Sequence, residues 1–233
     1  IYQSYSTVGT SVTSLSNEEI QENGELFLGE VLNDNLPGMN YFRSGGYGTV
    51  SGVQLRGLPK RYSTVYIDGV KMSDPSSVSN DFDFNNILTS QVSRVEILKG
   101  NQSSVYGSGA IGGTINITTK KGKPGFNKDL NYSLGSNQTH NLSTSLSGGK
   151  ENSLYYIGLQ RFQTDGISQM THNSEKDRYR NNGLVASFNN NLSDKFDFKS
   201  NARISETYLQ YDAVCVTDGL FGCSSTRDHS EEA

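Results

Sequence analysis

The most constraining feature of this chain is the alternation of short apolar segments with glycine between residues 53 and 119. Glycine reaches backbone conformations with positive φ that other residues avoid, so it permits tight turns between strands. The pair Asp68-Gly69, between Ser63–Ile67 and Val70–Met72, predicts a hairpin. Val92–Leu98 and Gly113–Thr118 are further predicted strands.

Helix signals are mixed with these strand signals up to about residue 122. Residues 10–15 alternate like a strand, and Ser16 followed by Glu19 is the pattern of a helix capping box. We expect further short helices over residues 25–32 and 85–91. The mixture predicts a small α+β domain over residues 1–122 with a core of its own.

Beyond residue 122 the helix signals stop and five strand-like segments follow. These segments are 128–134, 139–147, 153–162, 183–192 and 196–207. The connections 148–152 and 193–195 are tight, whereas 163–182 is long. An up-and-down meander with short turns at one end and long loops at the other is typical of outer-membrane barrels. A soluble antiparallel sandwich has the same alternation and is the alternative.

The fifth segment separates two faces of the predicted sheet. One face holds Phe196, Phe198, Ser200, Ala202 and Ile204. The other holds Asp197, Lys199, Asn201, Arg203 and Ser205. A Lys or Arg that faces lipid at the bilayer midplane costs about 2–4 kcal/mol, so the charged face must meet water or protein. Aromatic girdles at the membrane boundaries are predicted for Tyr155, Tyr156, Phe162 and Tyr208.

The composition excludes several classes of protein. Only 33% of the 233 residues are hydrophobic, and no run of about 18 apolar residues predicts a membrane-spanning helix. The net charge of −4 argues against a nucleic-acid partner. No signal peptide opens the chain, and residues 227–233 end in no turn or closing strand, so the chain looks cut at both ends. We expect such a piece alone neither to insert nor to transport, because an incomplete barrel leaves open strand edges.

No motif in the chain predicts catalysis. Gly107–Gly112 matches G-x-G-x-x-G, but a strand follows it instead of the helix that a dinucleotide site requires. His140, His172 and His229 are scattered in polar contexts. We therefore predict that the protein is not an enzyme and holds no cofactor.

Two cysteines, Cys215 and Cys223, enclose seven residues that include the turn pair Asp218-Gly219. In an oxidising compartment this spacing predicts a disulfide that braces a surface loop. Two thiols alone make a poor zinc site, since four ligands are expected.

The order of four short motifs in the first half resembles the plug domain of TonB-dependent outer-membrane receptors. The motifs are Leu55-Arg56-Gly57, Ile67-Asp68-Gly69-Val70, Arg94-Val95-Glu96 and Val105-Tyr106-Gly107. The resemblance implies an α+β plug domain (1–122) followed by antiparallel strands (123–233) of an incomplete 22-stranded transmembrane β-barrel. It also implies the bacterial outer membrane as location, TonB as partner and outer-membrane lipid as surroundings. Contacts between plug and barrel are predicted for Arg56, Arg94, Glu96 and Lys99.

Within that family the sequence is most similar to the vitamin B12 (cobalamin) receptors. The similar segments are Ser44–Gly52, Ser77–Ser79, Asp165-Gly166 and Tyr211–Ala213. The resemblance places substrate contacts at Val50, Ser51, Gly52, Val78, Ser79 and Tyr211. It implies import of a corrinoid; the alternatives are a ferric siderophore or another metal chelate, and then a soluble β-rich adhesin or glycan-binding module.

The calcium site of the cobalamin receptors has no counterpart here. Where those receptors carry a run of acids, this chain has Arg180-Asn181-Asn182-Gly183, which supplies no carboxylate. We therefore predict no metal site.

Overall fold

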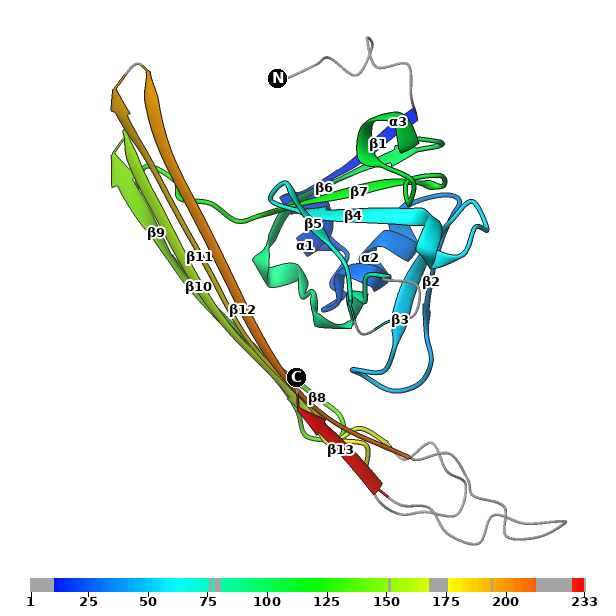
Figure 1. The fold of residues 1–233 in the computed structure, drawn as a ribbon. Coiled ribbons are helices and arrows are strands. Elements are labelled where there is room, and N and C mark those ends of the chain that lie inside the picture. Colours follow the sequence, from blue (N-terminus) through cyan, green and yellow to red (C-terminus); the bar gives the residue numbers. More distant parts are fainter. Residues whose placement is uncertain are drawn as a thin grey trace, which may run out of the picture. The chain divides into compact units, whose positions relative to one another are not determined.

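The computed structural model describes residues 11–75, 77, 81–150, 152–167, 176–193, 195–212 and 228–232 (Figure 1). The chain divides into two compact units. The first unit consists of Ile1–Arg43 and Ser51–Lys121, and the second of Ser44–Val50 and Gly122–Ala233. The short segment 44–50 thus belongs to the second unit, although both of its neighbours in the chain belong to the first.

A five-stranded sheet forms the framework of the first unit. Its strands, in spatial order, are β1 (Ser11–Ser16), β6 (Val92–Lys99), β7 (Gly113–Thr119), β4 (Ser63–Ile67) and β5 (Val70–Met72). Neighbours are antiparallel except β4 and β7, which are parallel. The predicted hairpin is confirmed: Asp68 and Gly69 join β4 to β5 with φ of 49° and 84°, a backbone typical of a two-residue hairpin turn.

Two short helices lie beside this sheet. The helix α1 (Asn17–Glu22) begins at the predicted capping box: Glu19 N–H donates to Ser16 Oγ, and Ser16 N–H donates to Glu19 Oε2 at 2.7 Å. The helix α2 (Leu28–Asn35) begins three residues later than predicted. The reason is tertiary, because Phe27 pairs with Leu88 in an isolated β-bridge.

The same bridge explains why residues 85–91 do not form the single helix that the sequence predicts. Leu88 is extended, so the segment is split into the 3-10 turns η3 (Phe84–Asn86) and η4 (Thr89–Gln91). Two other short elements are η2 (Lys60–Tyr62) and α3 (Ser103–Tyr106). The segment after Gly107–Gly112 is the strand β7, as predicted, so the glycine motif has no helix to bind pyrophosphate.

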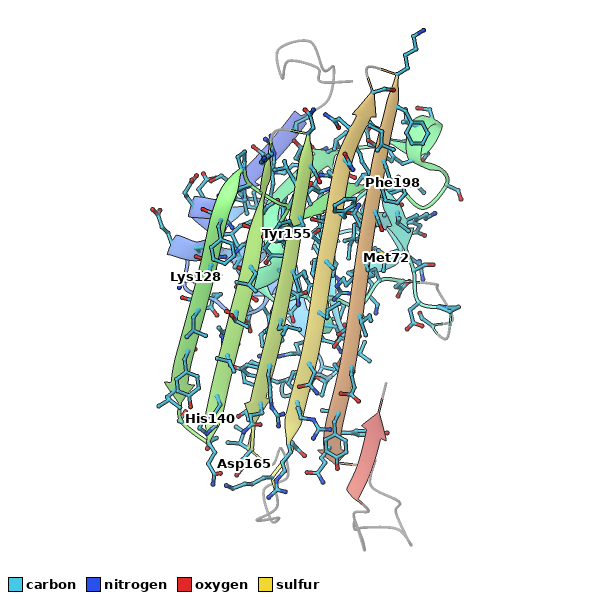
Figure 2. All side chains as sticks on the ribbon, turned by 90° about the vertical axis from the view of Figure 1, so that its left-hand side faces the viewer. Met72, Lys128, His140, Tyr155, Asp165 and Phe198 are labelled. Atoms are coloured by element: carbon cyan, nitrogen blue, oxygen red, sulfur yellow. The ribbon has the colours of Figure 1, made fainter. Side chains whose placement is uncertain are left out.

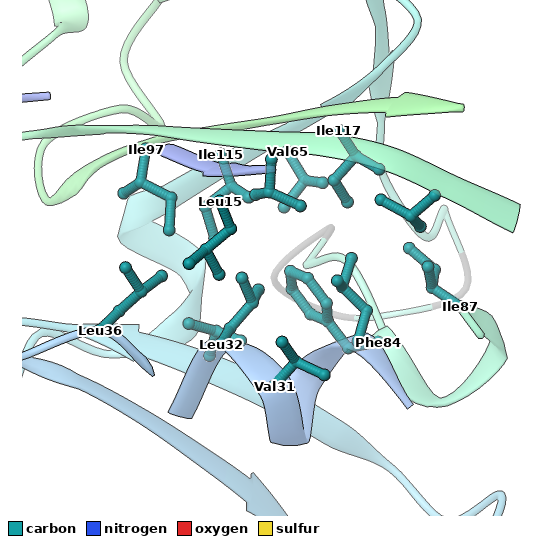
Figure 3. Packing of buried hydrophobic residues seen from close by; sticks show 14 of the residues in the cluster. Leu15, Val31, Leu32, Leu36, Val65, Phe84, Ile87, Ile97, Ile115 and Ile117 are labelled. Carbon is teal, nitrogen blue, oxygen red and sulfur yellow. The ribbon is translucent and has the colours of Figure 1, made fainter. Parts of the chain in front are cut away.

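The first unit has its own hydrophobic core between the sheet and α2 (Figure 3). Val31 and Leu32 of α2 face Ile97 and Ile115 of the sheet, and all four side chains are almost completely buried. Burial of a Leu, Ile or Val side chain contributes about 1.5–3 kcal/mol. All residues of this core belong to the first unit.

A small separate hairpin completes the first unit. It pairs β2 (Met39–Arg43) with β3 (Ser51–Leu55), and Arg43 lies opposite Ser51. Gly29 of α2 lies directly against the ring of Tyr41, where no side chain would fit.

The second unit is an antiparallel meander of six strands. They are β8 (Gly125–Gly135), β9 (Thr139–Lys150), β10 (Ser153–Thr164), β11 (Tyr179–Ser193), β12 (Phe196–Asp212) and β13 (Asp228–Glu232). Each strand pairs with its neighbours in the chain, so the predicted five-strand meander is confirmed. The sixth strand, β13, was not predicted; it pairs with residues 208–212 of β12.

The two faces of this sheet differ as the alternation predicts. One, the apolar face, exposes Phe126, Leu130, Leu146, Tyr155, Ile157, Leu159, Phe188, Phe198 and Ile204. The other, the polar face, carries Asn141, Ser143, Ser145, Ser147, Gln160, Asn181 and Ser187. Figure 2 shows His140 and Asp165 at one end of the strands and Tyr155 and Phe198 farther toward the other end.

Among the described residues, no helix has both the length and the apolar character needed to cross a membrane.

Candidate binding site

The segment 44–50, which joins β2 to β3, is held against the polar face of the second unit by aromatic rings. The ring of Tyr47 meets that of Phe162 edge-on, with centroids 5.4 Å apart and planes at 68°. Phe162 in turn contacts Tyr179 at 5.9 Å, and both are almost completely buried. Aromatic pairs in this geometry contribute about 0.5–1.5 kcal/mol each beyond area burial. We call Tyr47, Phe162 and Tyr179 the aromatic anchor.

Glycine at position 48 makes the close approach possible. Its φ is +85°, and a Cβ atom there would overlap the Tyr179 ring and lie 3.2 Å from Leu209 Cδ1. Asn181 Nδ2 donates to Tyr179 Oη at 3.2 Å and orients that ring. The segment also closes on itself, since Ser44 N–H donates to Val50 O at 2.9 Å.

Tyr211, a predicted substrate contact, lies on the same face as the anchor. It is two residues beyond Leu209 on β12, and successive side chains of a strand alternate between faces. Its side chain is 36% exposed. The polar face therefore ends, toward the longer loops, in a group of aromatic side chains of which Tyr211 is accessible.

Three other predicted substrate contacts lie in the described part of the chain, and they differ in solvent exposure. Val50 is 55% exposed. Ser51 is fully buried, and Gly52 lies against Lys60 and Phe42, with Lys60 Cδ only 2.6 Å from the position a Cβ would take. Their roles as substrate contacts stay predictions, and Val50 is the one whose side chain is open to a ligand.

Ser51 is fixed by a carboxylate of the first unit. Asp83 Oδ1 accepts hydrogen bonds from Ser51 Oγ at 2.6 Å, Ser51 N–H at 3.2 Å and Asn85 N–H at 3.1 Å. Nearby, Lys60 Nζ lies 3.4 Å from Asp81 Oδ2. These contacts fix the start of β3, which directly follows the segment 44–50.

An ion pair fixes the other end of the segment. Arg43 Nη1 lies 3.1 Å from Glu30 Oε1 of α2. Burial raises the pKa of Glu30, and the positive charge of Arg43 only partly offsets this effect. The residues on either side of the segment, Arg43 and Ser51, are thus both fixed within the first unit.

A charged cluster closes the β10–β11 end of the sheet. Asp165 accepts from Lys176 Nζ at 2.8 Å and lies 3.5 Å from Arg178 Nε. The hydrogen bond from Lys176 is the main cause that lowers the pKa of Asp165. Asp165-Gly166 was identified from the sequence by its similarity to the cobalamin receptors. Its ion-pair partners Lys176 and Arg178, which follow a long connection, were not predicted.

The residues with predicted plug–barrel contacts lie at the surface of the first unit. Arg94 Nη2 and Glu96 Oε1 of β6 are 2.7 Å apart. Lys99 Nζ donates to Pro37 O at 3.1 Å, and Arg56 lies in a turn with φ of 54°. Their contacts with a barrel stay predictions.

Four predicted site residues lie outside the described part of the chain. They are Val78 and Ser79 of the second substrate segment and the cysteines Cys215 and Cys223. Among the described residues, no group of three or more His, Cys, Asp or Glu side chains is arranged to hold a metal ion.

Sequence reasoning missed the aromatic anchor. It predicted Phe162 and Tyr156 in membrane girdles, but both lie on the polar face and are buried. Residue parity was an available signal, because Tyr156 and Phe162 lie on the face of the strand opposite that of Tyr155, Ile157 and Leu159.

The first unit matches a known family model over most of its length. Residues 5–114 match the family model of the TonB-dependent Receptor Plug Domain. The fold is therefore a plug domain followed by antiparallel strands that match the N-terminal part of TonB-dependent receptor barrels. The predicted fold class and the predicted bacterial outer-membrane location are confirmed.

Solved receptors share this fold at low sequence identity. The ferric yersiniabactin uptake receptor FyuA from Yersinia pestis is 24% identical, with a TM-score of 0.69 over 90% of this chain and 33% of its own. The pyoverdine outer membrane receptor FpvA from Pseudomonas aeruginosa PAO1 is 18% identical, with a TM-score of 0.70 over 87% and 28%. The ferric-catecholate import receptor Fiu from E. coli K12 is 21% identical, with a TM-score of 0.66 over 87% and 28%. The chain thus spans about a third of the length of these receptors.

Proposed function

We propose that this protein imports a ferric siderophore across the bacterial outer membrane, with energy delivered through TonB. The observation that carries the proposal is the plug domain over residues 5–114 continued by paired strands, an arrangement it has in common with solved ferric-siderophore receptors. The relatives are named as uptake and import receptors, which supports transport as the activity.

The exposed side chains at the candidate site support a large chelate as the ligand. Val50 and Tyr211 are exposed, and the aromatic anchor holds the segment that carries Val50. An aromatic and amide-rich surface contacts the organic part of a ligand through apolar area and a few polar groups. The contacts at Val50, Ser51, Gly52, Val78, Ser79 and Tyr211 belong to this proposal.

The mechanism that follows has three steps. The ligand binds at the segment 44–50 and the longer loops; TonB then pulls the N-terminal end of the chain; the plug rearranges and opens a path. Surface ion pairs between plug and barrel, each worth about 1 kcal/mol or less, suit a plug that must be released and rebound.

Corrinoid import is the second candidate, and it rests on the similarity of Ser44–Gly52 to the cobalamin receptors. The solved structures that resemble this chain are siderophore receptors, which favours the ferric chelate.

Calorimetric titration of the full-length receptor, purified from outer membranes, separates the two ligands. Ferric hydroxamate, catecholate and phenolate chelates are titrated in parallel with cyanocobalamin. We expect one class of ferric chelate to bind at submicromolar concentration and cyanocobalamin not to bind at micromolar concentration. Cyanocobalamin binding without any chelate binding would reverse the assignment, and uptake that persists in cells without TonB would remove the proposed energy source.

A further inference from the structure

The side chain of Lys60 covers the backbone of Gly52 in β3. A Cβ atom at Gly52 would lie 2.6 Å from Lys60 Cδ and 3.0 Å from Phe42 Cζ. The aliphatic part of the lysine therefore lies directly on Gly52, and only 22% of the lysine side chain is exposed. A lysine that packs its methylene groups in this way still directs its ammonium group toward a polar partner.

The ammonium group of Lys60 meets a buried carboxylate. Lys60 Nζ lies 3.4 Å from Asp81 Oδ2, and the Asp81 side chain is only 7% exposed. In the part of the chain that the structure describes, no donor forms a hydrogen bond with Asp81 Oδ1, and no cation other than Lys60 forms an ion pair with this residue. Because a buried charge without a partner is strongly destabilising, the position of Asp81 depends on Lys60.

Asp81 closes a loop in the connection between β5 and η3. Asp74 N–H donates to Asp81 O at 3.2 Å, and Ser77 N–H donates to Asp74 O at 3.2 Å. The second predicted substrate segment, Ser77–Ser79, is part of this connection. The ion pair of Asp81 therefore fixes the end of the connection that carries this segment.

The residues around Asp81 direct it toward β3. Phe82 and Phe84 pack on the core of the first unit, and their ring centroids are 5.0 Å apart. The carboxylate of Asp83, which lies between these rings in the chain, accepts from Ser51 Oγ at 2.6 Å. Asp81 holds the lysine that covers the next residue of β3. Two rings thus fix this stretch to the core, and two carboxylates fix it to the start of β3.

We propose that Lys60 is a positioning residue for ligand binding. Its aliphatic part fixes Gly52 and its ammonium group fixes Asp81, so one side chain joins the two segments with predicted substrate contacts, 50–52 and 77–79. Lys60 acts through these segments and does not itself contact the siderophore. The inference rests on the proposed function, because it takes both segments as parts of the ligand site. Loops that are held in place before binding lose less conformational freedom when the ligand arrives.

Hydrogen exchange of the full-length receptor, purified from outer membranes, tests this role without any ligand. Lys60→Met keeps most of the aliphatic part and removes the charge. We expect the amide hydrogens of Asp74 and Ser77 to exchange about tenfold faster in this variant, since a contact with a charged group adds about this factor to a local closing equilibrium. Asp81→Asn should have the same effect. The double variant should exchange no faster than either single variant, because both substitutions remove the same contact.

Two further variants separate the ion pair from a general loss of folding. Lys60→Arg keeps the charge and should exchange like the unaltered receptor. Arg61→Met removes the neighbouring cation, whose guanidinium lies 5.0 Å from the centre of the Tyr62 ring, and should leave exchange in residues 73–81 unchanged. Unchanged exchange in Lys60→Met, or equal acceleration in Arg61→Met, would overturn the proposal.

Calorimetry with the ferric hydroxamate, catecholate and phenolate chelates connects the ion pair to ligand binding. For the chelate that binds the unaltered receptor, Lys60→Met should weaken binding about tenfold, and Lys60→Arg should bind like the unaltered receptor. Faster exchange with unchanged affinity would show that the ion pair serves stability alone and would overturn the positioning role. Absence of binding by every chelate to the unaltered receptor would overturn the proposed function and this role with it, whereas unchanged exchange in Lys60→Met overturns only the role of Lys60.

Discussion

The carboxylate of Asp68 holds Thr119 through both of its oxygens. Asp68 Oδ2 accepts from Thr119 Oγ1 at 2.6 Å, and Oδ1 accepts from Thr119 N–H at 3.2 Å. Lys121 Nζ lies 3.4 Å from the same Oδ1. The hairpin turn between β4 and β5 thereby fixes the last residue of β7, just before the chain leaves the first unit at Lys121.

The first prediction is that residues 1–121 fold alone. Their core is built from the sheet and α2 of the same unit (Figure 3), and units with an independent core fold independently. We expect cooperative urea unfolding followed by circular dichroism. A broad, non-cooperative transition would show that the core needs the remaining strands.

The second prediction concerns Asp68 in that fragment. Asp68→Ala should lower the free energy of unfolding by about 2 kcal/mol, because hydrogen bonds to a charged group contribute about 1.5–3 kcal/mol and Ala is strained at φ of 49°. Asp34→Ala is the control; it removes an exposed carboxylate of α2 and should change the unfolding free energy by less than about 0.5 kcal/mol. Equal effects of the two substitutions would contradict the role given to Asp68.

The third prediction concerns the aromatic anchor. Tyr47→Ala should weaken binding of the ferric chelate about tenfold, because the segment 44–50 loses its edge-on contact with Phe162 and must be ordered when ligand binds. Tyr47→Phe keeps the ring and should bind like the unaltered protein. Calorimetry with the chelate selected above measures both. Unchanged affinity in Tyr47→Ala would mean that the segment is ordered without the ring.

The fourth prediction is a pH dependence caused by Glu30. Its pKa in the folded state is raised, chiefly by burial, so its protonated form is favoured by folding. This contribution to stability is fully present below the unfolded pKa of about 4.3 and is lost as pH rises through the higher folded pKa. Relative to Glu30→Gln, the unaltered fragment should therefore lose stability as the pH rises above about 4.3.

Urea unfolding at a series of pH values tests this prediction. Glu22→Gln, an exposed position at the end of α1, serves as the control and should show no such trend. A stability difference between Glu30→Gln and the unaltered fragment that stays constant with pH would contradict the raised pKa.

Local patterns predicted much of the fold because the forces behind them are local. The capping box at Ser16 and Glu19 and the turn at Asp68-Gly69 depend on neighbouring residues, and the structure contains both. Elements set by distant partners were predicted less well. The bridge between Phe27 and Leu88 delays α2 and divides the expected helix at 85–91.

The candidate site was predicted only in part for the same reason. The resemblance indicated the segment around Val50 and the position of Tyr211, but the aromatic anchor joins residues more than a hundred positions apart. The strand β13 was missed because Asp228–Glu232 has no apolar alternation. It forms by pairing with the backbone of β12, and such pairing leaves little trace in sequence.

The sequence by itself determined the two kinds of architecture in this protein, because glycine-bounded apolar segments and period-two alternation depend only on backbone geometry. It also determined the two faces of the long strands, since a side chain cannot change face without a shift of register. Only the tertiary structure decided that Tyr47 packs on Phe162 and that Lys60 pairs with Asp81. Those contacts depend on how distant segments align, and no local interaction encodes that alignment.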